Sequence, residues 1–413
     1  MSSFILGLST SQIAALSTAT IANLSTEDWA AFSTAQIVAL SALQAGAIGT
    51  LGVSSLSATQ VNAFQTQDLV ALRLDSFRAL SGAQVAALSN NQVAALRTQQ
   101  VAALSTTQIA ALGSAQIVAL GSAQVASMGS GQVSALSSVQ IAAFETADLR
   151  AFNTAALRSI STEALAGLSQ YHMLALATQQ FVALSSQQMA GLSSTQVAAI
   201  SQTQAAAFGS AQLQALSSEQ TRALSTAAVS ALSVANVLAL NTEQIQGLTT
   251  TQVAALTSNQ FSHLITAQVQ ALSTAQVVAM STAQAQSLTT VQAVALSTAQ
   301  AQALETRDVA VLSTANVRQL SSAQVAALSS EQVAALTSTQ AAALGTQQAA
   351  ALSSSQVAAL ESADLRALAS STLRALGTDA IAGLSTAQVD AMGTRQFTAL
   401  ASAQVAALSS AQV

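Results

Sequence analysis

The residues that could do chemistry are few and scattered along the chain. Its only histidines are His172 and His263, which lie far apart in the sequence, and it has no cysteine. No cluster of carboxylates accompanies either histidine, so the pattern lacks the ligand set of a zinc site. Serines are abundant, but a nucleophilic serine needs a positioned base, and no Ser–His–Asp arrangement is indicated. There is also no Gly-rich phosphate loop and no acidic calcium-binding loop.

Two aromatic residues have simpler structural interpretations. Tyr171 and His172 lie in the irregular stretch 169–176, SQYHMLAL, which we interpret as a packing variant. Trp29 occupies a position that we assign to the core. Helix capping accounts better for the many serines than nucleophilic chemistry does. We therefore predict no catalytic, cofactor-binding or metal-binding residue, no cofactor and no enzyme activity.

Composition limits the partners. The net charge is −5, charged residues are 7% of the chain, and all 11 basic residues are arginine. An acidic chain without lysine lacks the positive surface that nucleic acid or an anionic membrane requires. Hydrophobic residues reach 51%, but Ser, Thr or Gln interrupts them every few residues, so we predict no membrane insertion. The start, MSSFILGLSTSQ, lacks the basic segment of a secretory signal. Export without a cleaved signal peptide and a cytoplasmic location both fit.

The whole chain is a tandem repeat of eight residues. Every multiple of eight from 8 to 408 holds a large apolar residue, and leucine fills 40 of these 51 positions without any shift of register. Numbering the octad 1 to 8 and ending on that residue gives the consensus S-T-A-Q-V-A-A-L. Position 4 is usually Gln, position 5 is Val, Ile, Leu, Phe or Ala, and position 7 is small. Positions 3 and 6 vary most and carry most of the arginines.

A period of eight favours a short helix that restarts in every octad. In one continuous helix the leucine stripe would drift by about 80° per octad, because each residue turns the helix about 100°. In a strand, positions 5 and 8 would point to opposite faces, which leaves a β-solenoid as the weaker alternative. Disorder or cross-β assembly is another rival for a chain so rich in Ser and Gln. In a helix of five or six residues, positions 5 and 8 share one face, which we assign to the core.

The cap of each helix can be assigned in two ways. We place the N-cap at position 2, which is Ser or Thr in 43 of 51 octads. Gly or Asn at position 1 would then suit the left-handed residue that ends the preceding helix. The alternative makes position 1 the N-cap and the Gln at position 4 its capping-box partner. Position 2 is preferred because Arg97, Ile265 and Glu305 at position 1 would be poor caps.

One octad cannot fold alone. Ordering eight residues costs about 8–16 kcal/mol in backbone entropy, while burying one Leu and one Val returns about 3–6 kcal/mol. Neighbouring octads must supply the rest, so we predict an all-α solenoid, a superhelix of very short helices with one per octad. We expect residues 1–413 to form a single continuous array without separate domains. Because the chain stops at Val413 in mid-octad, we also expect a fragment of a longer array or an end completed by another chain.

The repeat resembles two kinds of known sequence. The phrase LSTAQAQAL at Leu296–Leu304 is similar to the opening helix of transcription-activator-like effector repeats. Those repeats are longer and have a second helix and a base-reading loop, so DNA binding does not carry over. All 413 residues look more like the Ala/Ser/Thr/Gln-rich octapeptide tracts of large bacterial secreted or surface proteins. That resemblance implies a filament, stalk or adhesin-like role.

These observations lead to two functional hypotheses. The first is a structural repeat protein, an extracellular filament or cell-surface spacer that assembles with copies of itself, with other surface proteins as further partners. The second is a solenoid scaffold that binds proteins through positions 3 and 6, with Arg366 and Arg374 as candidate contact residues. Ice or carbohydrate binding by rows of Ser and Thr ranks below both, because we assign those hydroxyls to capping.

Overall fold

Every octad folds into one short helix in the computed structural model, which describes residues 3–413. These residues form one 3-10 helix and fifty α-helices, and they contain no strand. Each α-helix begins at position 2 of its octad and spans four to six residues. The predicted all-α solenoid with one helix per octad is confirmed.

The chain divides into two compact units, Met1–Ala215 and Leu216–Val413. The octad register runs through both of them. Whether the chain behaves as the single continuous array expected from the sequence stays a prediction.

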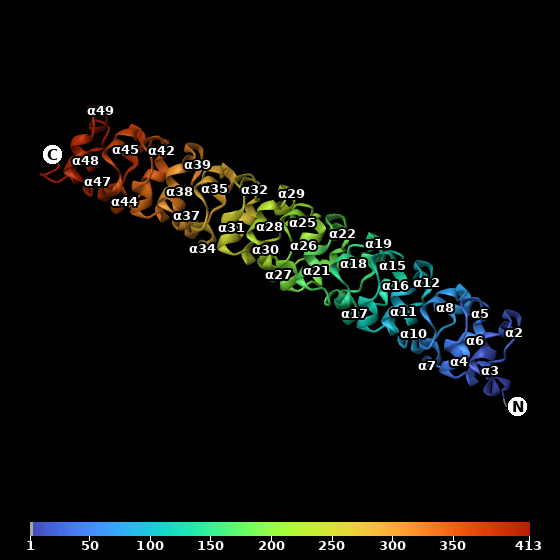
Figure 1. Ribbon diagram of the computed structural model, residues 1–413. Helices are drawn as coiled ribbons and strands as arrows, with labels where there is room; N and C mark the ends of the chain where they lie inside the picture. The colour runs from blue at the N-terminus through green and yellow to red at the C-terminus, as the bar shows by residue number, and fades with distance from the viewer. Residues whose placement is uncertain (1–2) are drawn as a thin grey trace. The chain divides into compact units, whose positions relative to one another are not determined.

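The first unit contains the 3-10 helix and the first twenty-six α-helices (Figure 1). Their bounds are η1 Phe4–Gly7, α1 Thr10–Ala14, α2 Thr18–Ala22, α3 Thr26–Ala31, α4 Thr34–Val38, α5 Ala42–Gly46, α6 Thr50–Ser55, α7 Ala58–Asn62, α8 Thr66–Ala71, α9 Leu74–Arg78, α10 Gly82–Ala86, α11 Asn90–Ala95, α12 Thr98–Ala103, α13 Thr106–Ala111, α14 Ser114–Val118, α15 Ser122–Ala126, α16 Ser130–Ser134, α17 Ser138–Ala143, α18 Thr146–Leu149, α19 Thr154–Ser159, α20 Thr162–Leu165, α21 Gln170–Ala175, α22 Thr178–Ala183, α23 Ser186–Ala190, α24 Ser194–Ala198, α25 Gln202–Ala206 and α26 Ser210–Gln214.

The second unit contains the remaining twenty-four α-helices. Their bounds are α27 Ser218–Ala223, α28 Thr226–Ala231, α29 Val234–Ala239, α30 Thr242–Gly247, α31 Thr250–Ala255, α32 Ser258–Ser262, α33 Thr266–Ala271, α34 Thr274–Val278, α35 Thr282–Ser287, α36 Thr290–Ala295, α37 Thr298–Ala303, α38 Thr306–Val311, α39 Thr314–Gln319, α40 Ser322–Ala327, α41 Ser330–Ala334, α42 Ser338–Ala343, α43 Thr346–Ala350, α44 Ser354–Ala359, α45 Ser362–Ala367, α46 Ser370–Ala375, α47 Thr378–Ala382, α48 Thr386–Ala391, α49 Thr394–Phe397 and α50 Ser402–Ala407.

The preferred cap assignment from the sequence is wrong, and the alternative is right. Position 1 is the N-cap, and in most octads it forms a capping box with the Gln at position 4. In α35, the Ser281 hydroxyl accepts from the Gln284 N–H at 3.3 Å, and Gln284 Oε1 accepts from the Ser281 N–H at 2.8 Å. Arg97, Ile265 and Glu305 are N-caps too, although none makes a side-chain cap bond. At Arg97 and Ile265 the glutamine half of the box is enough, since its Oε1 still accepts the N-cap N–H.

Glycine at position 1 does not end helices in a left-handed conformation. Gly113 has φ −78° and ψ 162°, which is extended backbone, and no residue in the described range has a positive φ. The chain leaves each helix through positions 7 and 8 instead. At Leu256, for example, φ is −58° and ψ is 133°. A short extended link of this kind turns the chain into the next helix without a left-handed residue.

Helices three octads apart stack against one another within each unit. In the first unit α4 packs on α7 and α7 on α10, which lie side by side in Figure 1. We call a series of this kind, in which each helix contacts the helix three further along, a stacking row. Glutamine hydrogen bonds reach 28 to 31 residues back along the chain. One turn of the solenoid therefore holds between three and four octads.

Positions 5 and 8 fill the centre of each turn. Val253 and Leu256 are 0% and 3% exposed, and the same holds for equivalent residues along the chain. Around the interior side chains from Ala301 to Leu352 a space of only about 10 Å³ remains, and its lining of Ala, Val and Leu side chains offers a water molecule no polar partner. The core is therefore dry and packed, as the pattern of positions 5 and 8 predicts.

The small residue at position 7 touches position 2 of the helix below. Adding a Cβ to Gly247 would bring it within 2.9 Å of the Ser218 side chain, and a Cβ on Gly383 would meet Ser354 at 3.2 Å. In both pairs the serine opens the helix three octads back. Ser and Thr recur at position 2 because a small side chain fits this contact, not because they cap the helix.

The position 4 glutamine ties each turn to the previous one. Gln284 is fully buried, and its Nε2 donates to the carbonyl oxygens of Val253 and Leu256, both at 2.7 Å. Without that donor the Leu256 carbonyl loses its partner, while the Val253 carbonyl keeps the Leu256 N–H. A buried group left unsatisfied costs about 1–3 kcal/mol.

We predict that Gln284→Ala loosens the solenoid locally. Backbone amides of 250–256 and 282–288 should exchange with solvent about tenfold faster or more, because each turn is held mainly by its neighbours. Hydrogen exchange followed by mass spectrometry measures this change. Gln286→Ala is the matched control, since Gln286 is an exposed residue on the same helix and its loss should leave exchange unchanged. Equal protection in both variants would contradict the bridging role of Gln284.

A pair of glycines tests the contact between positions 7 and 2. In Gly167→Ala the new Cβ would clash with the Ser138 carbonyl, whose carbon lies 2.8 Å away, while Gly131 has no atom within 4 Å. We expect Gly167→Ala to lower stability by about 1–3 kcal/mol through overpacking. Gly131→Ala should instead raise it by about 0.5–1 kcal/mol, because alanine favours a helix. Calorimetric Tm values of the two variants show whether each substitution lowers or raises stability as expected. A stabilising Gly167→Ala would contradict the close contact between Gly167 and Ser138.

Candidate functional site

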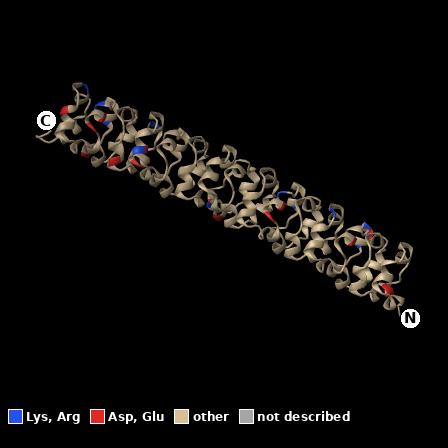
Figure 2. Cartoon of the chain, in the orientation of Figure 1, with Lys and Arg blue, Asp and Glu red and all other residues tan. Residues whose placement is uncertain are grey.

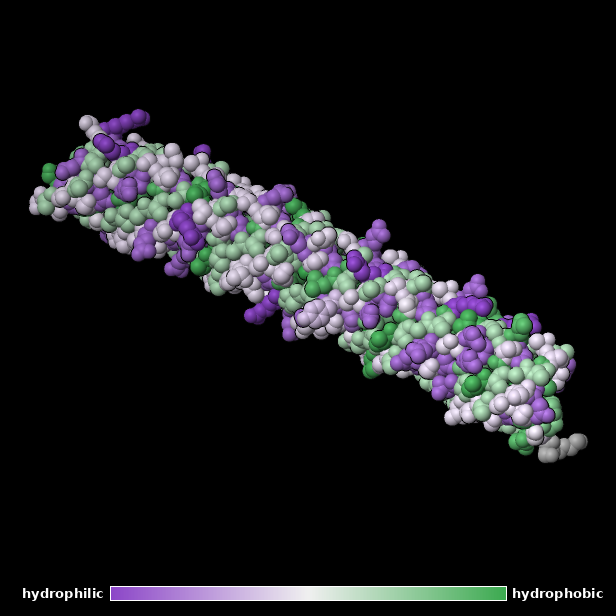
Figure 3. Space-filling view, viewed as in Figure 1, coloured by the Kyte–Doolittle hydropathy of each residue, from purple (hydrophilic) through white to green (hydrophobic). Residues whose placement is uncertain are grey.

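The outer surface of the solenoid consists of positions 1, 2, 3, 6 and 7, since positions 4, 5 and 8 face inward. Where two helices of a stacking row meet, positions 6 and 7 of one lie beside positions 2 and 3 of another, and shallow grooves form there. Most of the visible surface is pale or purple in Figure 3, with single strongly hydrophobic residues between.

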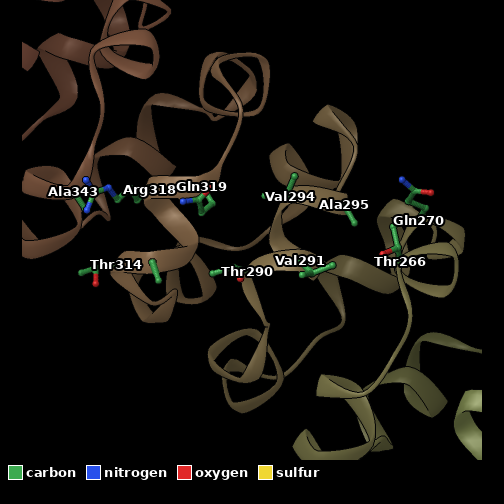
Figure 4. A pocket seen from close by; sticks show the side chains of 11 residues that line it. Thr266, Gln270, Thr290, Val291, Val294, Ala295, Thr314, Arg318, Gln319 and Ala343 are labelled. Atoms are coloured by element: carbon green, nitrogen blue, oxygen red, sulfur yellow. The ribbon is translucent and has the colours of Figure 1, made fainter.

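A spacious groove lies on the stacking row of α33, α36, α39 and α42, and we call it the 266–343 groove. Its volume is about 790 Å³. Figure 4 shows Arg318, Gln319, Val294, Ala295 and Gln270 along one side, and threonines with Val291 along the other. The lining residues are Thr266, Gln270, Thr290, Val291, Val294, Ala295, Thr314, Ala315, Arg318, Gln319 and Ala343.

The groove is mixed in polarity and carries one charge. Val291 and Val294 are 66% and 48% exposed. Arg318 is the only charged residue in the lining, and within residues 3–413 the single ion pair joins Arg307 to Glu305, so Arg318 has no acidic partner there. Charged side chains are sparse elsewhere too, as Figure 2 shows. The groove therefore combines one unpaired arginine with two exposed valines.

Sequence reasoning proposed Arg366 and Arg374 as contact residues, and the structure separates them. Both are exposed, but they lie on α45 and α46, which belong to different stacking rows. Arg374 lines a second groove of about 490 Å³ on α46 and α49. Arg366 lies in the same stacking row as Arg318, two steps further along. The sequence missed Arg318 as a groove residue because the stacking of every third octad is not visible in the octads themselves.

The histidines and nearby aromatics hold structural positions. His172 replaces the position 4 glutamine, and its Nδ1 accepts the Ser169 N–H at 3.1 Å. Burial lowers the pKa of His172, and the hydrogen bond to the Phe144 carbonyl opposes that shift. His263 is exposed and lies 2.7 Å from the Asn259 carbonyl. Tyr171 points outward with 67% exposure, and the buried Trp29 stacks on Phe32.

No group of three or more His, Cys, Asp or Glu side chains in residues 3–413 is arranged to hold a metal ion. Over the same range, none of the helices is both long enough and apolar enough to cross a membrane.

Some residues that replace the position 4 glutamine keep a hydrogen-bond donor, whereas Ala156, Ala164, Ala228 and Ala380 do not. Ser76, Asn316 and Thr372 each donate to the carbonyl 28 residues earlier, at 2.7, 2.8 and 3.0 Å. An ionised aspartate cannot do so, since it only accepts. In Asp68 and Asp308, both fully buried, neither carboxyl oxygen has a hydrogen-bond partner.

Burial raises the pKa of both carboxyl groups. For Asp68 desolvation is the sole cause. For Asp308 desolvation is the largest cause, Arg307 acts against it, and Glu305 adds to it. Asp28 is the opposite case, because hydrogen bonds from the Ser3 and Ser25 hydroxyls lower its pKa. The buried aspartates therefore favour protonation, and a protonated carboxyl regains the donor that the glutamine supplies elsewhere.

We predict a pH-dependent gain in stability for Asp68→Gln. A group whose pKa is raised in the folded chain contributes stability below its ordinary pKa of 3.8 and loses it as pH rises through the folded value. The variant should match the parent chain near pH 3 and exceed its Tm at pH 7 by about 2–4 °C, the shift that about 1 kcal/mol gives in a unit of this size. Thermal melts from pH 3 to pH 7 measure the difference.

Asp28→Asn serves as the control with the opposite sign. In the parent chain the pKa of the Asp28 carboxyl is lowered on folding. Its contribution to stability is therefore present above pH 3.8 and is lost as pH falls through the folded value. The Asn variant should be less stable than the parent chain at pH 7, and the gap should close toward low pH. A constant Tm difference for Asp68→Gln across the range would show that this carboxyl does not titrate on unfolding.

Comparison with known proteins identifies the repeat. The family model of the ALTTAQ repeat matches ten segments that together cover more than half of the chain. These are residues 61–98, 74–106, 90–122, 101–138, 141–178, 205–242, 235–266, 262–298, 301–338 and 357–394. The sequence-based expectation of a short tandem-repeat protein is confirmed.

Among solved structures, the leucine-rich repeat-containing protein LegL7 from Legionella pneumophila is similar in part. It shares 13% identity over 56% of this chain and 79% of its own, with a TM-score of 0.17. A search of curated protein sequences found no match.

Proposed function

This chain belongs to the ALTTAQ repeat family, and from that premise we propose that it is a helical-repeat scaffold that binds other proteins along its outer surface. One observation carries the proposal. Positions 5 and 8, which fill the core, are almost always apolar and position 4 is usually glutamine, while the exposed positions 3 and 6 vary most and line the grooves. Variation confined to an outer surface is what a repeat scaffold needs to distinguish partners.

The proposal includes no catalytic step and no cofactor. The buried glutamines are engaged in the turn-to-turn hydrogen bonds, and the 266–343 groove carries no pair of acid and base. A partner would be recognised by shape, a few charges and hydrogen bonds. Nucleic acid is a poor fit, because the groove lining has a single arginine and no aromatic side chain on which bases could stack.

A comparative affinity purification tests the scaffold. The immobilised parent chain and a variant with Arg318→Ala, Arg366→Ala and Arg374→Ala are exposed to extract of the source organism, and bound proteins are quantified by mass spectrometry. We expect at least one protein to be retained about tenfold less by the variant, the change that about 1.4 kcal/mol gives. Circular dichroism controls for folding. Recovery of the same proteins in equal amounts would contradict binding through these positions.

A second candidate is a spacer or filament outside the cell. Its support is the uniformity of the array, since every turn offers the same kind of contact and a turn of a second copy would meet a matching surface. Under this proposal the protein acts at the cell surface or beyond it, and its partners are copies of itself or other surface proteins. Electron microscopy of the purified chain over a range of concentrations tests it, and compact monomers throughout would count against self-assembly.

A further inference from the structure

We propose that the 266–343 groove is a docking site for an extended peptide segment that carries a carboxylate and aliphatic side chains. The inference rests on the proposed scaffold function and specifies one partner chemistry for it. The groove follows the four stacked helices α33, α36, α39 and α42, so its chemical groups come from every third octad of the chain.

The positive charge of Arg318 favours an acidic peptide segment. Arg318 is exposed, is the only charged side chain in the lining, and forms no ion pair within residues 3–413. A guanidinium presents a planar set of donors that matches a carboxylate in two-point contact. No acidic residue of the groove competes for it, so a carboxylate on the incoming segment would meet an available partner.

The two valines select aliphatic side chains beside that carboxylate. Val291 and Val294 lie in the middle of the groove, on α36, and both remain well exposed. Covering them removes apolar surface from water, which favours association. Arg318 lies on α39, the next helix of the stacking row after α36. On the bound peptide, the carboxylate that contacts Arg318 and the aliphatic side chain that contacts the valines should therefore be a few residues apart.

The walls favour an extended main chain. Threonine hydroxyls at Thr266, Thr290 and Thr314 line one side, and the amides of Gln270 and Gln319 lie on the other (Figure 4). Hydroxyls and amides can both donate and accept, which suits the alternating N–H and C=O groups of an extended peptide. Helices pack about 8–10 Å apart, so four of them span about 24–30 Å, the length of about 8 extended residues at about 3.3 Å each.

Other ligands fit this groove less well. Sugars and nucleic-acid bases are usually held against aromatic rings, and no lining residue is aromatic. The volume of about 790 Å³ is drug-sized, but the groove is shallow and open along its length, whereas sites for small molecules enclose most of the ligand. A narrow peptide strand is therefore the occupant that the lining favours.

Peptide selection on the full-length chain tests the inference. A phage-displayed library of random 12-residue peptides is panned on the immobilised protein, and enriched peptides are synthesised and measured by fluorescence anisotropy. We expect the selected peptides to share an Asp or Glu near aliphatic residues. Their Kd should rise tenfold or more with Arg318→Ala and with Val294→Asp, and the Arg318 effect should weaken at high salt.

Arg222→Ala is the matched control, because Arg222 occupies the same octad position in the same stacking row but lies outside the groove. It should leave the Kd within a factor of two. Failure to enrich any peptide, enrichment of basic peptides, or equal binding by the Arg318 and Val294 variants would each overturn the inference. Peptides that bind a different stretch of the outer surface would overturn it as well while leaving the scaffold standing, so the two proposals can fail separately.

Discussion

The hydrogen bond from the position 4 glutamine to the turn before it is the interaction on which the rest of the solenoid depends. One side chain does two tasks. Its Oε1 accepts the N–H of the N-cap residue, which fixes where the helix starts, and its Nε2 donates to carbonyls 28 and 31 residues earlier, which fixes how far the next turn lies. Because 28 residues are three and a half octads, helices on adjacent turns are staggered. The period of eight and the pitch of the solenoid are thus set by the same residue.

This dependence explains the strict register of the sequence. A single inserted residue would separate a glutamine from its N-cap partner or from the carbonyls one turn away, and buried carbonyls without donors are costly. Loops in ordinary folds absorb insertions because their backbone faces water, whereas here the link between helices is only a few residues and ends on the buried leucine. Several substitutions at position 4 keep that donor, although those to alanine do not. Ser76, Asn316, Thr372 and His172 each retain a donor, and Asp68 and Asp308 regain one only when protonated.

Much of this architecture can be predicted from the sequence. The features that could not be predicted were all missed for one physical reason. A helix per octad, a core of positions 5 and 8 and small residues at position 7 can be read from local geometry. The position of the N-cap could not be read in this way. The usual preference for Ser, Thr, Asp or Asn at the N-cap disfavours Arg97 and Ile265, but the glutamine three residues later accepts the N-cap N–H whatever the side chain. The number of octads per turn and the 266–343 groove depend on contacts between residues three to four octads apart. In a uniform repeat, every such spacing looks alike in the sequence, so Arg318 could not be distinguished from Arg366 or Arg374.

The octad positions have different structural roles, and these roles determine which positions can change to suit a binding partner. Positions 1, 4, 5 and 8 form the solenoid, and positions 2 and 7 are mostly small where they touch between stacked helices. Positions 3 and 6 are exposed and vary most, so a substitution there changes the surface with little cost to stability. Each such change acts together with whatever stands three octads away, as Val294 and Arg318 do in one groove. A binding surface on this fold is therefore composed across octads that are distant in the sequence, and its specificity lies in the combination of neighbouring turns rather than in any one repeat.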